Sequence, residues 1–169
     1  MKNTGIFFLA IISFSLVLSC KKSGLLSRKD DYIIFGEFHG FCGGNKCVNL
    51  YELTRTELLE DTLDIYPSIY FASTFVKCKF STNRTDKYKI ARALVDSIPE
   101  ALLNDPTQVF GSPDNLDQGG FYLEVKKKGL HRFWFFDTYT QTLPSEYLGF
   151  HKTLSAILGE LRWEYTEDG

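Results

Sequence analysis

The most regular alternation of apolar and polar residues in this 169-residue chain lies between residues 117 and 138. Phe121, Leu123 and Val125 alternate with polar or amphipathic residues, which is the period of a strand with one buried face. A turn-forming run, KKG at 127–129, follows, and a second aromatic-rich run comes directly after it. The pattern predicts a β-hairpin around which the rest of the domain is built.

Two registers are compatible with this turn. A two-residue loop at 128–129 pairs Glu124 with Phe133. A three-residue loop, with Gly129 left-handed at a bulge, pairs Glu124 with Arg132 instead. We favour the second register, because opposite charges and aromatic pairs across strands contribute about 0.2–1 kcal/mol each.

The favoured register sets Tyr122 opposite Trp134 on the outer face of the hairpin. The inner face, which needs burial, then carries Phe121, Leu123, Val125, Phe133 and Phe135. An apolar outer face is either covered by another segment or is a contact surface. Together with Asp117 and Gln118 at the hairpin entrance, Tyr122 and Trp134 form our candidate binding surface.

The remaining chain divides into strands followed by helices, and then the hairpin and a last helix. Runs of period two predict strands over residues 31–38, 48–53, 57–61 and 75–80. Runs of period 3.6 predict helices over residues 86–96, 100–103 and 146–162, capped by Thr85, Ser97 and Ser145. The expected fold class is α+β: an antiparallel sheet of about four to six strands, packed by helices on one face, in the order ββ(β)-α-ββ-α.

The last predicted helix carries an apolar stripe at positions i, i+3, i+4 and i+7. The stripe consists of Tyr147, Phe150, Leu154, Ile157, Leu158 and Leu161. We expect it to cover the inner face of the hairpin. Burial of six such side chains contributes about 10 kcal/mol before the loss of chain entropy is subtracted.

The amino terminus has the pattern of an export signal. Met1-Lys2 precedes an apolar run over residues 6–18, which is shorter than the roughly 20 residues of a membrane span. Residues 17–20 (VLSC) resemble the bacterial lipobox, which implies that Cys20 becomes the first mature residue and carries lipid. Two or more acyl chains anchor a protein stably. The alternative is a plain signal peptide in which Cys20 is incidental.

We therefore expect a lipoprotein signal peptide over 1–19, a polar tether over 20–31 and a single α+β domain over 32–165. The expected location is the bacterial cell envelope, with the domain lipid-anchored and either periplasmic or surface-exposed. The whole chain has 19 basic and 21 acidic side chains. This weakly negative balance argues against a partner bound through bulk charge, whether nucleic acid or an acidic surface.

Three cysteines follow the expected cleavage site: Cys42, Cys47 and Cys78. An exported protein can form disulfides, and the two glycines between Cys42 and Cys47 favour closure of that loop. We predict a Cys42–Cys47 bridge, which stabilises by about 2 kcal/mol, and a buried Cys78 thiol. The rival pairing joins Cys78 to Cys42 or Cys47. A zinc site with His39 lacks a fourth ligand, so we expect no metal and no cofactor.

The chain contains no phosphate-binding glycine motif and no C-x-x-C redox motif. We therefore expect a non-catalytic domain whose partners are the membrane, through the lipid, and an envelope protein or a small ligand. The alternative is an envelope hydrolase using carboxylates or a metal ion. That alternative requires Glu37, Asp114, Asp117 and His131 to converge in one cleft.

Four stretches resemble a group of small predicted lipoproteins of Bacteroidota. They are FGEFHGFCGGNKCVNLYEL, LEDT…YP, SIPEALLN and SPDNLDQGGFYLEVKKKG, and the resemblance covers nearly all of residues 33–160. It implies an exported, anchored protein with a strand-strand-helix-strand-strand-helix order. No activity is attached to the group, so the resemblance carries over no functional residue.

Overall fold

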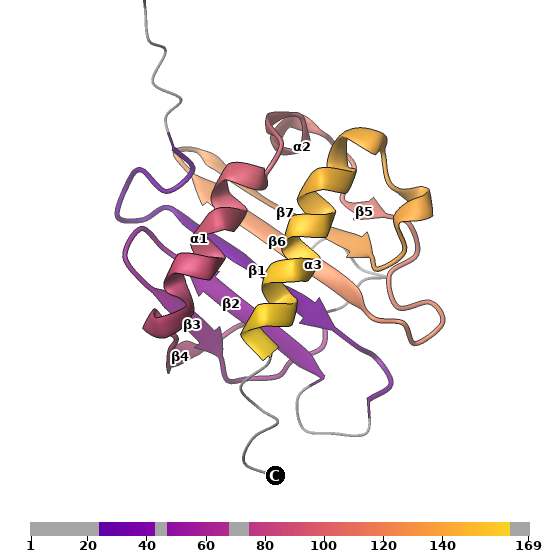
Figure 1. Cartoon of the computed structure of the whole chain (residues 1–169), viewed down its shortest axis with the longest axis horizontal. Helices are drawn as coiled ribbons and strands as arrows, with labels where there is room; N and C mark the ends of the chain where they lie inside the picture. The colour runs from indigo at the N-terminus through magenta and orange to yellow at the C-terminus, as the bar shows by residue number, and fades with distance from the viewer. Residues whose placement is uncertain (1–23, 43–46, 68–74, 163–169) are drawn as a thin grey trace, which may run out of the picture.

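Apolar strands pair into one mixed sheet that runs through the part of the chain described by the computed structural model, residues 24–42, 47–67 and 75–162 (Figure 1). Within these residues the sheet has seven strands, in the order β4-β3-β2-β1-β6-β7-β5. They are β1 (Tyr32–Phe38), β2 (Val48–Leu53), β3 (Leu58–Asp61), β4 (Phe80–Asn83), β5 (Val109–Phe110), β6 (Gly120–Lys127) and β7 (Leu130–Asp137). The helices are α1 (Tyr88–Ser97), α2 (Glu100–Asn104) and α3 (Leu148–Arg162).

The predicted α+β class is confirmed, but the sheet is larger than expected and not wholly antiparallel. The two-residue strand β5 pairs in parallel with β7, and it is too short to show a period in the sequence. The strand expected over residues 75–80 is wrong, because β4 begins at Phe80. Val76 and Cys78 instead pack against the outer face of the sheet, so their alternation reflects contact with that face.

The hairpin register is the two-residue one, so the favoured three-residue register is wrong. Glu124 pairs with Phe133, and Leu123 pairs with Trp134. Lys128 and Gly129 both have positive φ, which is the geometry that matches a two-residue turn to the twist of its strands. A slip of one residue turns every side chain of β7 to the other face.

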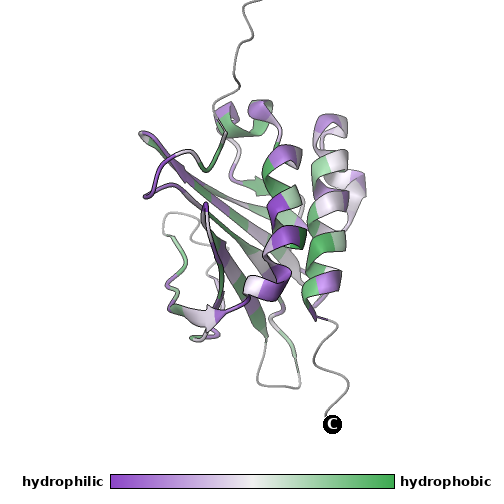
Figure 2. Ribbon diagram, turned by 60° about the vertical axis from the view of Figure 1, so that its left-hand side comes forward, coloured by the Kyte–Doolittle hydropathy of each residue, from purple (hydrophilic) through white to green (hydrophobic). Residues whose placement is uncertain are grey.

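The helices lie on one face of the sheet, and Figure 2 shows α1 and α3 together on that side. The main core lies between them and the sheet, and it contains Leu123 and Trp134 from the hairpin. The stripe of α3 belongs to this core, from Phe150 to Leu161, which confirms the predicted cover over Leu123. Phe133 and Phe135, which were also expected on the face beneath α3, lie on the opposite face.

A smaller core lies on the opposite face of the sheet. Its buried members are Ile34, Phe38, Val48, Leu50, Tyr122, Phe133 and Phe135. Val76, Cys78 and Phe80 pack against it from the segment before β4. Both faces of the central strands are therefore covered, which explains why β1 and β6 are buried at most of their positions.

The helices begin differently from the predicted caps. Asn83, and not Thr85, supplies the side-chain oxygen that accepts the Thr85 N–H, at 2.8 Å. The Ser97 hydroxyl donates back to the carbonyl of Leu94 at 2.7 Å and so does not form a capping box. A 3-10 turn precedes both α1 and α3. Its backbone carbonyls accept hydrogen bonds from N–H groups whose hydrogen bonds a capping side chain would otherwise accept.

The segment before β1 is folded, in contrast to the expected tether through Asp31. Leu25 and Leu26 are 8% and 4% exposed and belong to the main core. Asp31 is buried and accepts the backbone N–H groups of Ser27 and Arg28 at 3.0 and 2.7 Å. Among the described residues, no helix combines the length and the apolar character that crossing a membrane requires.

The sheet has two ends that matter for function. We call residues 24–31 with the turn at 128–129 the turn end, at the upper left of Figure 1. We call residues 39–42, 47, 62–66 and 111–119 the loop end, at the lower right. Strand β1 connects the two, and its seven residues span about 20 Å.

Candidate functional site

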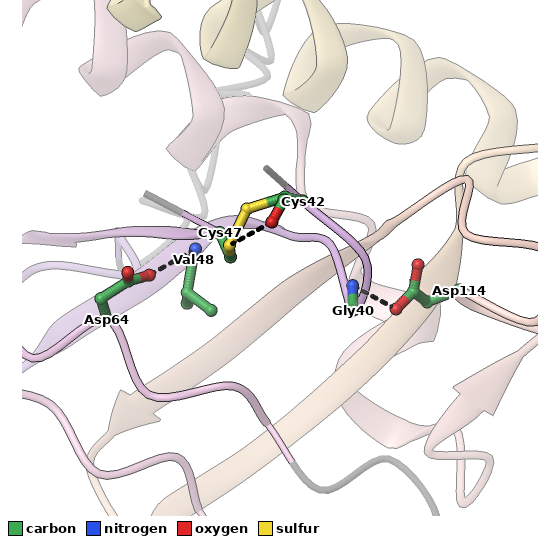
Figure 3. Close-up of a disulfide and its surroundings, with 6 residues drawn as sticks. All are labelled: Gly40, Cys42, Cys47, Val48, Asp64 and Asp114. Carbon is green, nitrogen blue, oxygen red and sulfur yellow. Dashed lines mark hydrogen bonds between the residues drawn. A yellow bond between two sulfur atoms is a disulfide. The ribbon is translucent and has the colours of Figure 1, made fainter. Parts of the chain in front are cut away.

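The first loop-end element is the connection between β1 and β2, which a disulfide closes (Figure 3). The His39 N–H donates to the carbonyl of Cys47 at 2.8 Å and extends the pairing of the two strands. Cys42 and Cys47 then form the predicted disulfide, with their Cα atoms 5.7 Å apart. The remaining cysteine of the described chain, Cys78, is a half-buried free thiol. The thiols of Cys42 and Cys47 are therefore committed to each other and cannot form the zinc site that we considered.

Asp114 fastens this connection to the loop before β6. Its carboxylate accepts the Gly40 N–H at 2.5 Å, the Gly119 N–H at 2.8 Å and the Tyr66 hydroxyl at 2.7 Å. Gly119 has φ +77°, and a Cβ added there would lie 2.3 Å from Nδ1 of His39. Both the backbone angle and the close approach therefore require glycine at this position. One carboxylate thus joins three chain segments.

A second carboxylate fixes the other base of the 111–119 loop. Asp137 is buried and accepts the N–H groups of Ser112 and Tyr139, each at 2.9 Å. Gln118 donates to the carbonyl of Ser112 at 3.0 Å and accepts the Leu116 N–H at 2.7 Å. Gln118, which the sequence singled out for binding, therefore acts as an internal brace of its loop.

The 62–66 segment is attached in the same way. Asp64, at φ +50°, accepts the backbone N–H of Val48 at 2.7 Å. Figure 3 shows this bond and the Gly40–Asp114 bond on either side of the disulfide. The loop end is consequently a set of irregular segments next to the β1–β2 connection. Carboxylates and one disulfide hold these segments together.

Large apolar side chains project from these braced loops. Phe41 is 81% exposed and Leu116 is 78% exposed, while Tyr66 is 40% exposed. Asp117 lies next to Leu116 and is exposed, at φ +57°. We define these four residues as the loop-end surface. Phe41 follows Gly40 directly and Leu116 is two residues after Asp114, so both tips lie within a few residues of the same hydrogen-bonded junction.

The structure places the predicted binding residues apart. Tyr122 and Trp134 are both fully buried, on opposite faces of the sheet, so they form no exposed aromatic pair. The cause is the register, which turns Trp134 towards the helices and leaves Tyr122 under Phe135. Asp117 alone of the four candidates is fully exposed.

The sequence reasoning missed Phe41, Tyr66 and Leu116. A signal existed, because each of them is a large apolar residue inside a stretch of turn-forming residues. Periodicity gives no weight to such residues, since they belong to no strand or helix. Their exposure becomes visible only when the fold brings the three loops together.

The four side chains required for a hydrolase lie in different surroundings. Asp114 binds loop backbone, and Asp117 is exposed beside it. Glu37 is buried on the helix face and pairs with Nε of Arg162 at 3.2 Å. Burial raises the pKa of Glu37, with Arg162 and His39 acting in the opposite direction. His131 lies in β7 beside the hairpin turn, so the hydrolase alternative loses the constellation on which it was based.

His131 belongs instead to a polar cluster under the turn end. Glu124 is 2% exposed, and its carboxylate accepts the hydroxyls of Tyr122 at 2.6 Å and Tyr32 at 3.0 Å. Nε2 of His131 lies 2.8 Å from the same carboxylate. Burial, and then the negative charge of Glu124, raise the pKa of both tyrosines, which therefore remain hydroxyl donors. Phe75 stacks on the His131 ring with a centroid distance of 3.9 Å.

Cys78 lies close to this cluster, but its thiol is expected to be unreactive. Burial raises the pKa of its thiol to about 12, and the charges of Asp61, Glu124 and Glu52 act in the same direction. A thiol that stays protonated at neutral pH is a poor nucleophile. The cluster therefore resembles a structural hydrogen-bond network more than a catalytic one.

Among the described residues, no three His, Cys, Asp or Glu side chains gather in a way that could hold a metal ion. The chain matches no protein-family model, and no curated protein shows significant similarity to it. Function must therefore be argued from the geometry of the two ends.

Proposed function

We propose that this chain is an exported, lipid-anchored domain that binds a protein of the cell envelope through its loop-end surface. The observation that carries the proposal is the exposure of Phe41 and Leu116 on loops that Asp114 and a disulfide hold in place. A large apolar side chain gains nothing for folding while it remains in water. Its fixed presentation at a loop tip is typical of a contact residue.

The braces explain how such a surface would bind. Association is opposed by the ordering of loops and side chains, and loops that are fixed in advance avoid part of that cost. Large apolar residues seated in pockets dominate the energy of most interfaces. Phe41 and Leu116 would fill apolar pockets, while the exposed carboxylate of Asp117 favours basic groups around them. The partner we expect is therefore a protein surface with apolar pockets and a basic rim.

The proposed anchor fits the position of this surface. The lipobox resemblance assigns the lipid to Cys20, and residues 21–24 separate Cys20 from the buried Leu25. Leu25 lies at the turn end, and the loop end is about 20 Å away along β1. A lipid on Cys20 would therefore leave Phe41 and Leu116 directed away from the membrane, towards other envelope components.

The test is cross-linking in cells that produce the full chain, comparing the wild type with Phe41→Ser and Leu116→Ser. The control is Leu148→Ser, since Leu148 is also exposed but lies at the start of α3. We expect both loop-end variants to lose partner capture about tenfold or more, while the control keeps it. Phe41→Ser and Leu116→Ser should unfold within about 0.5 kcal/mol of the wild type, because they replace exposed residues. Leu148→Ser should lose more stability, about 1 kcal/mol, because Leu148 is only 38% exposed, so lower capture by the loop-end variants cannot be a stability effect.

Equal capture by the wild type and both loop-end variants would overturn the proposed surface, as would the absence of any captured protein. The anchor is tested separately by mass spectrometry of the chain recovered from membranes. We expect lipid on Cys20. An unmodified Cys20 in the exported product would remove the anchor and leave the binding surface to be judged by the cross-linking.

A further inference from the structure

The turn end carries a cluster of exposed cations. Arg28 and Lys29 precede β1, Lys126 lies near the end of β6, and Lys128 lies in the hairpin turn. Among the acidic residues beside them only Asp30 is exposed, while Asp31 and Glu124 are buried and occupied by hydrogen-bond donors. Glu52 is half-buried, and burial raises its pKa, while the charge of Lys126 acts to lower it. Glu57, half-buried, lies in the next turn, which also carries the exposed Arg55. The cations are therefore in excess on this surface.

The fold creates this cluster from two segments that are about a hundred residues apart in sequence. Tyr32 pairs with Lys126, which sets the hairpin turn beside the start of β1. The Lys128 N–H donates to Asp31 at 3.3 Å, and the Lys126 ammonium lies 5.2 Å from the centroid of the Tyr32 ring. Figure 1 shows the hairpin turn and the residues before β1 together at the upper left. We call Arg28, Lys29, Lys126 and Lys128 the basic end.

We propose that the basic end docks on anionic phospholipid headgroups and so fixes the orientation of the domain on its membrane. The inference rests on the proposed function, since the lipid on Cys20 brings this end to the surface. Residues 21–24 span at most about 14 Å when fully extended. The surface potential of an anionic membrane falls off over a Debye length of about 8–10 Å. The four cations therefore come within its reach when residues 21–24 are less than fully extended.

Charge complementarity selects this occupant over the others. A lysine or arginine near an anionic leaflet strengthens binding by about fivefold, so four of them act together appreciably while each remains weak alone. The whole chain has more acidic than basic side chains, so bulk charge favours no polyanion, and the attraction rests on the four cations that the fold gathers beside the proposed anchor. The loop end, by contrast, exposes Asp117 beside its apolar tips and is unsuited to an anionic surface. Docking at the basic end would hold the loop end away from the membrane.

The experiment uses the full chain, recovered from producing cells and reconstituted into vesicles of phosphatidylcholine alone or with phosphatidylglycerol. Lysines are reductively methylated, which preserves their charge, and the rate at each lysine is read by mass spectrometry. We expect Lys29, Lys126 and Lys128 to react about threefold or more slowly in the anionic vesicles. Three exposed lysines elsewhere serve as internal controls and should react equally in both: Lys77, Lys89 and Lys152. About 0.5 M NaCl should abolish the difference.

A matched pair of variants isolates the cause. Arg28→Gln combined with Lys29→Gln and Lys128→Gln should remove the protection of Lys126. The control combination removes the same number of charges elsewhere, at Lys77, Lys89 and Lys152, and should leave Lys126 protected. Equal reaction rates in the two vesicles, or uniform slowing of all six lysines, would overturn the docking.

The failure of docking can be told apart from the failure of the anchor. A chain that floats with phosphatidylcholine vesicles but shows no lysine protection in anionic ones is anchored and undocked. A chain that carries no lipid on Cys20 and fails to float with phosphatidylcholine, yet is protected at the basic end in anionic vesicles, is docked and unanchored. The second result would keep this inference and overturn the anchor in the proposed function.

Discussion

The turn end and the loop end use the same device to hold chain segments that are far apart in sequence. At the turn end, Asp31 accepts backbone N–H groups from Ser27, Arg28 and Lys128. At the loop end, Asp114 accepts backbone N–H groups from Gly40 and Gly119. In both places, one carboxylate replaces the regular pairing that turns cannot supply.

The surfaces that these braces present are different. The turn end exposes cations, and the loop end exposes Phe41, Leu116 and the carboxylate of Asp117. The braces also differ in kind, because Glu124 adds a buried network under the turn end, while the loop end combines the carboxylates of Asp64, Asp114 and Asp137 with a disulfide. At each end, the residues that hold the loops in place differ from the residues exposed to a partner. Either set can therefore be removed by mutation without the other.

The largest effect should come from Glu124→Ala, which removes the acceptor for two tyrosine hydroxyls and the partner of His131. Loss of the shared acceptor leaves both tyrosine hydroxyls without it, at a cost of about 1–3 kcal/mol for each one that is buried. We expect the free energy of unfolding to fall by about that amount in urea titrations, because Tyr122 cannot reach water from the core.

Glu52→Ala is the matched control, since Glu52 is half-buried on β2, which β1 separates from β6, and has no hydrogen bond within the described residues. Burial raises the pKa of Glu52, and the charges of Glu57 and Glu124 raise it further. An acid whose folded pKa is raised destabilises the fold when it ionises above about pH 4. Glu52→Ala should therefore be neutral or stabilising at pH 7, and a loss as large as that of Glu124→Ala would contradict this view of the network.

The next effect tests the loop end through Asp114→Asn. Asparagine also adopts the left-handed backbone found at Asp114, so the change isolates the loss of charged acceptors. We expect the free energy of unfolding to fall by about 2 kcal/mol. Partner capture should fall as well, because Phe41 and Leu116 are then less firmly placed.

Asp117→Asn is the control for that variant, because Asp117 has nearly the same φ but an exposed side chain. Its stability should change by less than about 0.5 kcal/mol. If the two variants lose equal stability, then backbone conformation, and not the hydrogen bonds of Asp114, decides the order of the loop end.

An effect of about the same size should follow from removing the disulfide. Cys42→Ser combined with Cys47→Ser removes a bridge that closes a loop of sequence separation five, worth about 2 kcal/mol. Reduction of the wild type should give the same loss, measured by chemical denaturation. Cys78→Ala provides the control, since it should leave the loss on reduction unchanged. If the double cysteine variant also loosened the turn end, Lys128 would be methylated faster than in the wild type. That result would contradict the separation of the two ends.

The fold was largely accessible from the sequence where periodicity and turn chemistry agree. Strand β2 lies where the alternation of residues 48–53 predicts it, and the disulfide follows from the Cys42–Cys47 spacing. The position of the hairpin was predicted correctly, but its strand register was not. Cross-strand charge and aromatic pairs contribute less than the burial of Trp134 and the fit of a two-residue turn, and the sequence offers no scale for that comparison.

The candidate site was less accessible, for a physical reason. Whether Phe41 and Leu116 are exposed depends on Asp114 and Gly119, which lie about 75 residues along the chain from the first of them. The Glu124 network likewise depends on Tyr32, from another strand. The local pattern of apolar and polar residues indicates which face of an element a residue lies on. It does not indicate which residue, distant in sequence, will form a hydrogen bond with it.

The smallest effect concerns Asp31, and it separates the two braces by pH. Burial raises the pKa of Asp31, but the N–H and O–H donors of Ser27, Arg28 and Lys128 outweigh it and hold the pKa below its ordinary value. A carboxyl with a lowered folded pKa stabilises the protein above its unfolded pKa of about 4, and that contribution is lost as the pH falls through the folded value. Asp31→Asn should therefore cost about 1 kcal/mol at pH 7.

The difference between the wild type and Asp31→Asn should shrink as the pH falls below about 4, because the wild-type carboxyl then becomes protonated. Urea titrations at both pH values measure this. Lowering the pH below about 4 should not restore partner capture to Phe41→Ser or Leu116→Ser. Asp31 lies at the opposite end of β1 from these residues. A stability difference that stays constant with pH would show that Asp31 acts through its shape alone, and the turn end would then have no charged brace to set against Asp114.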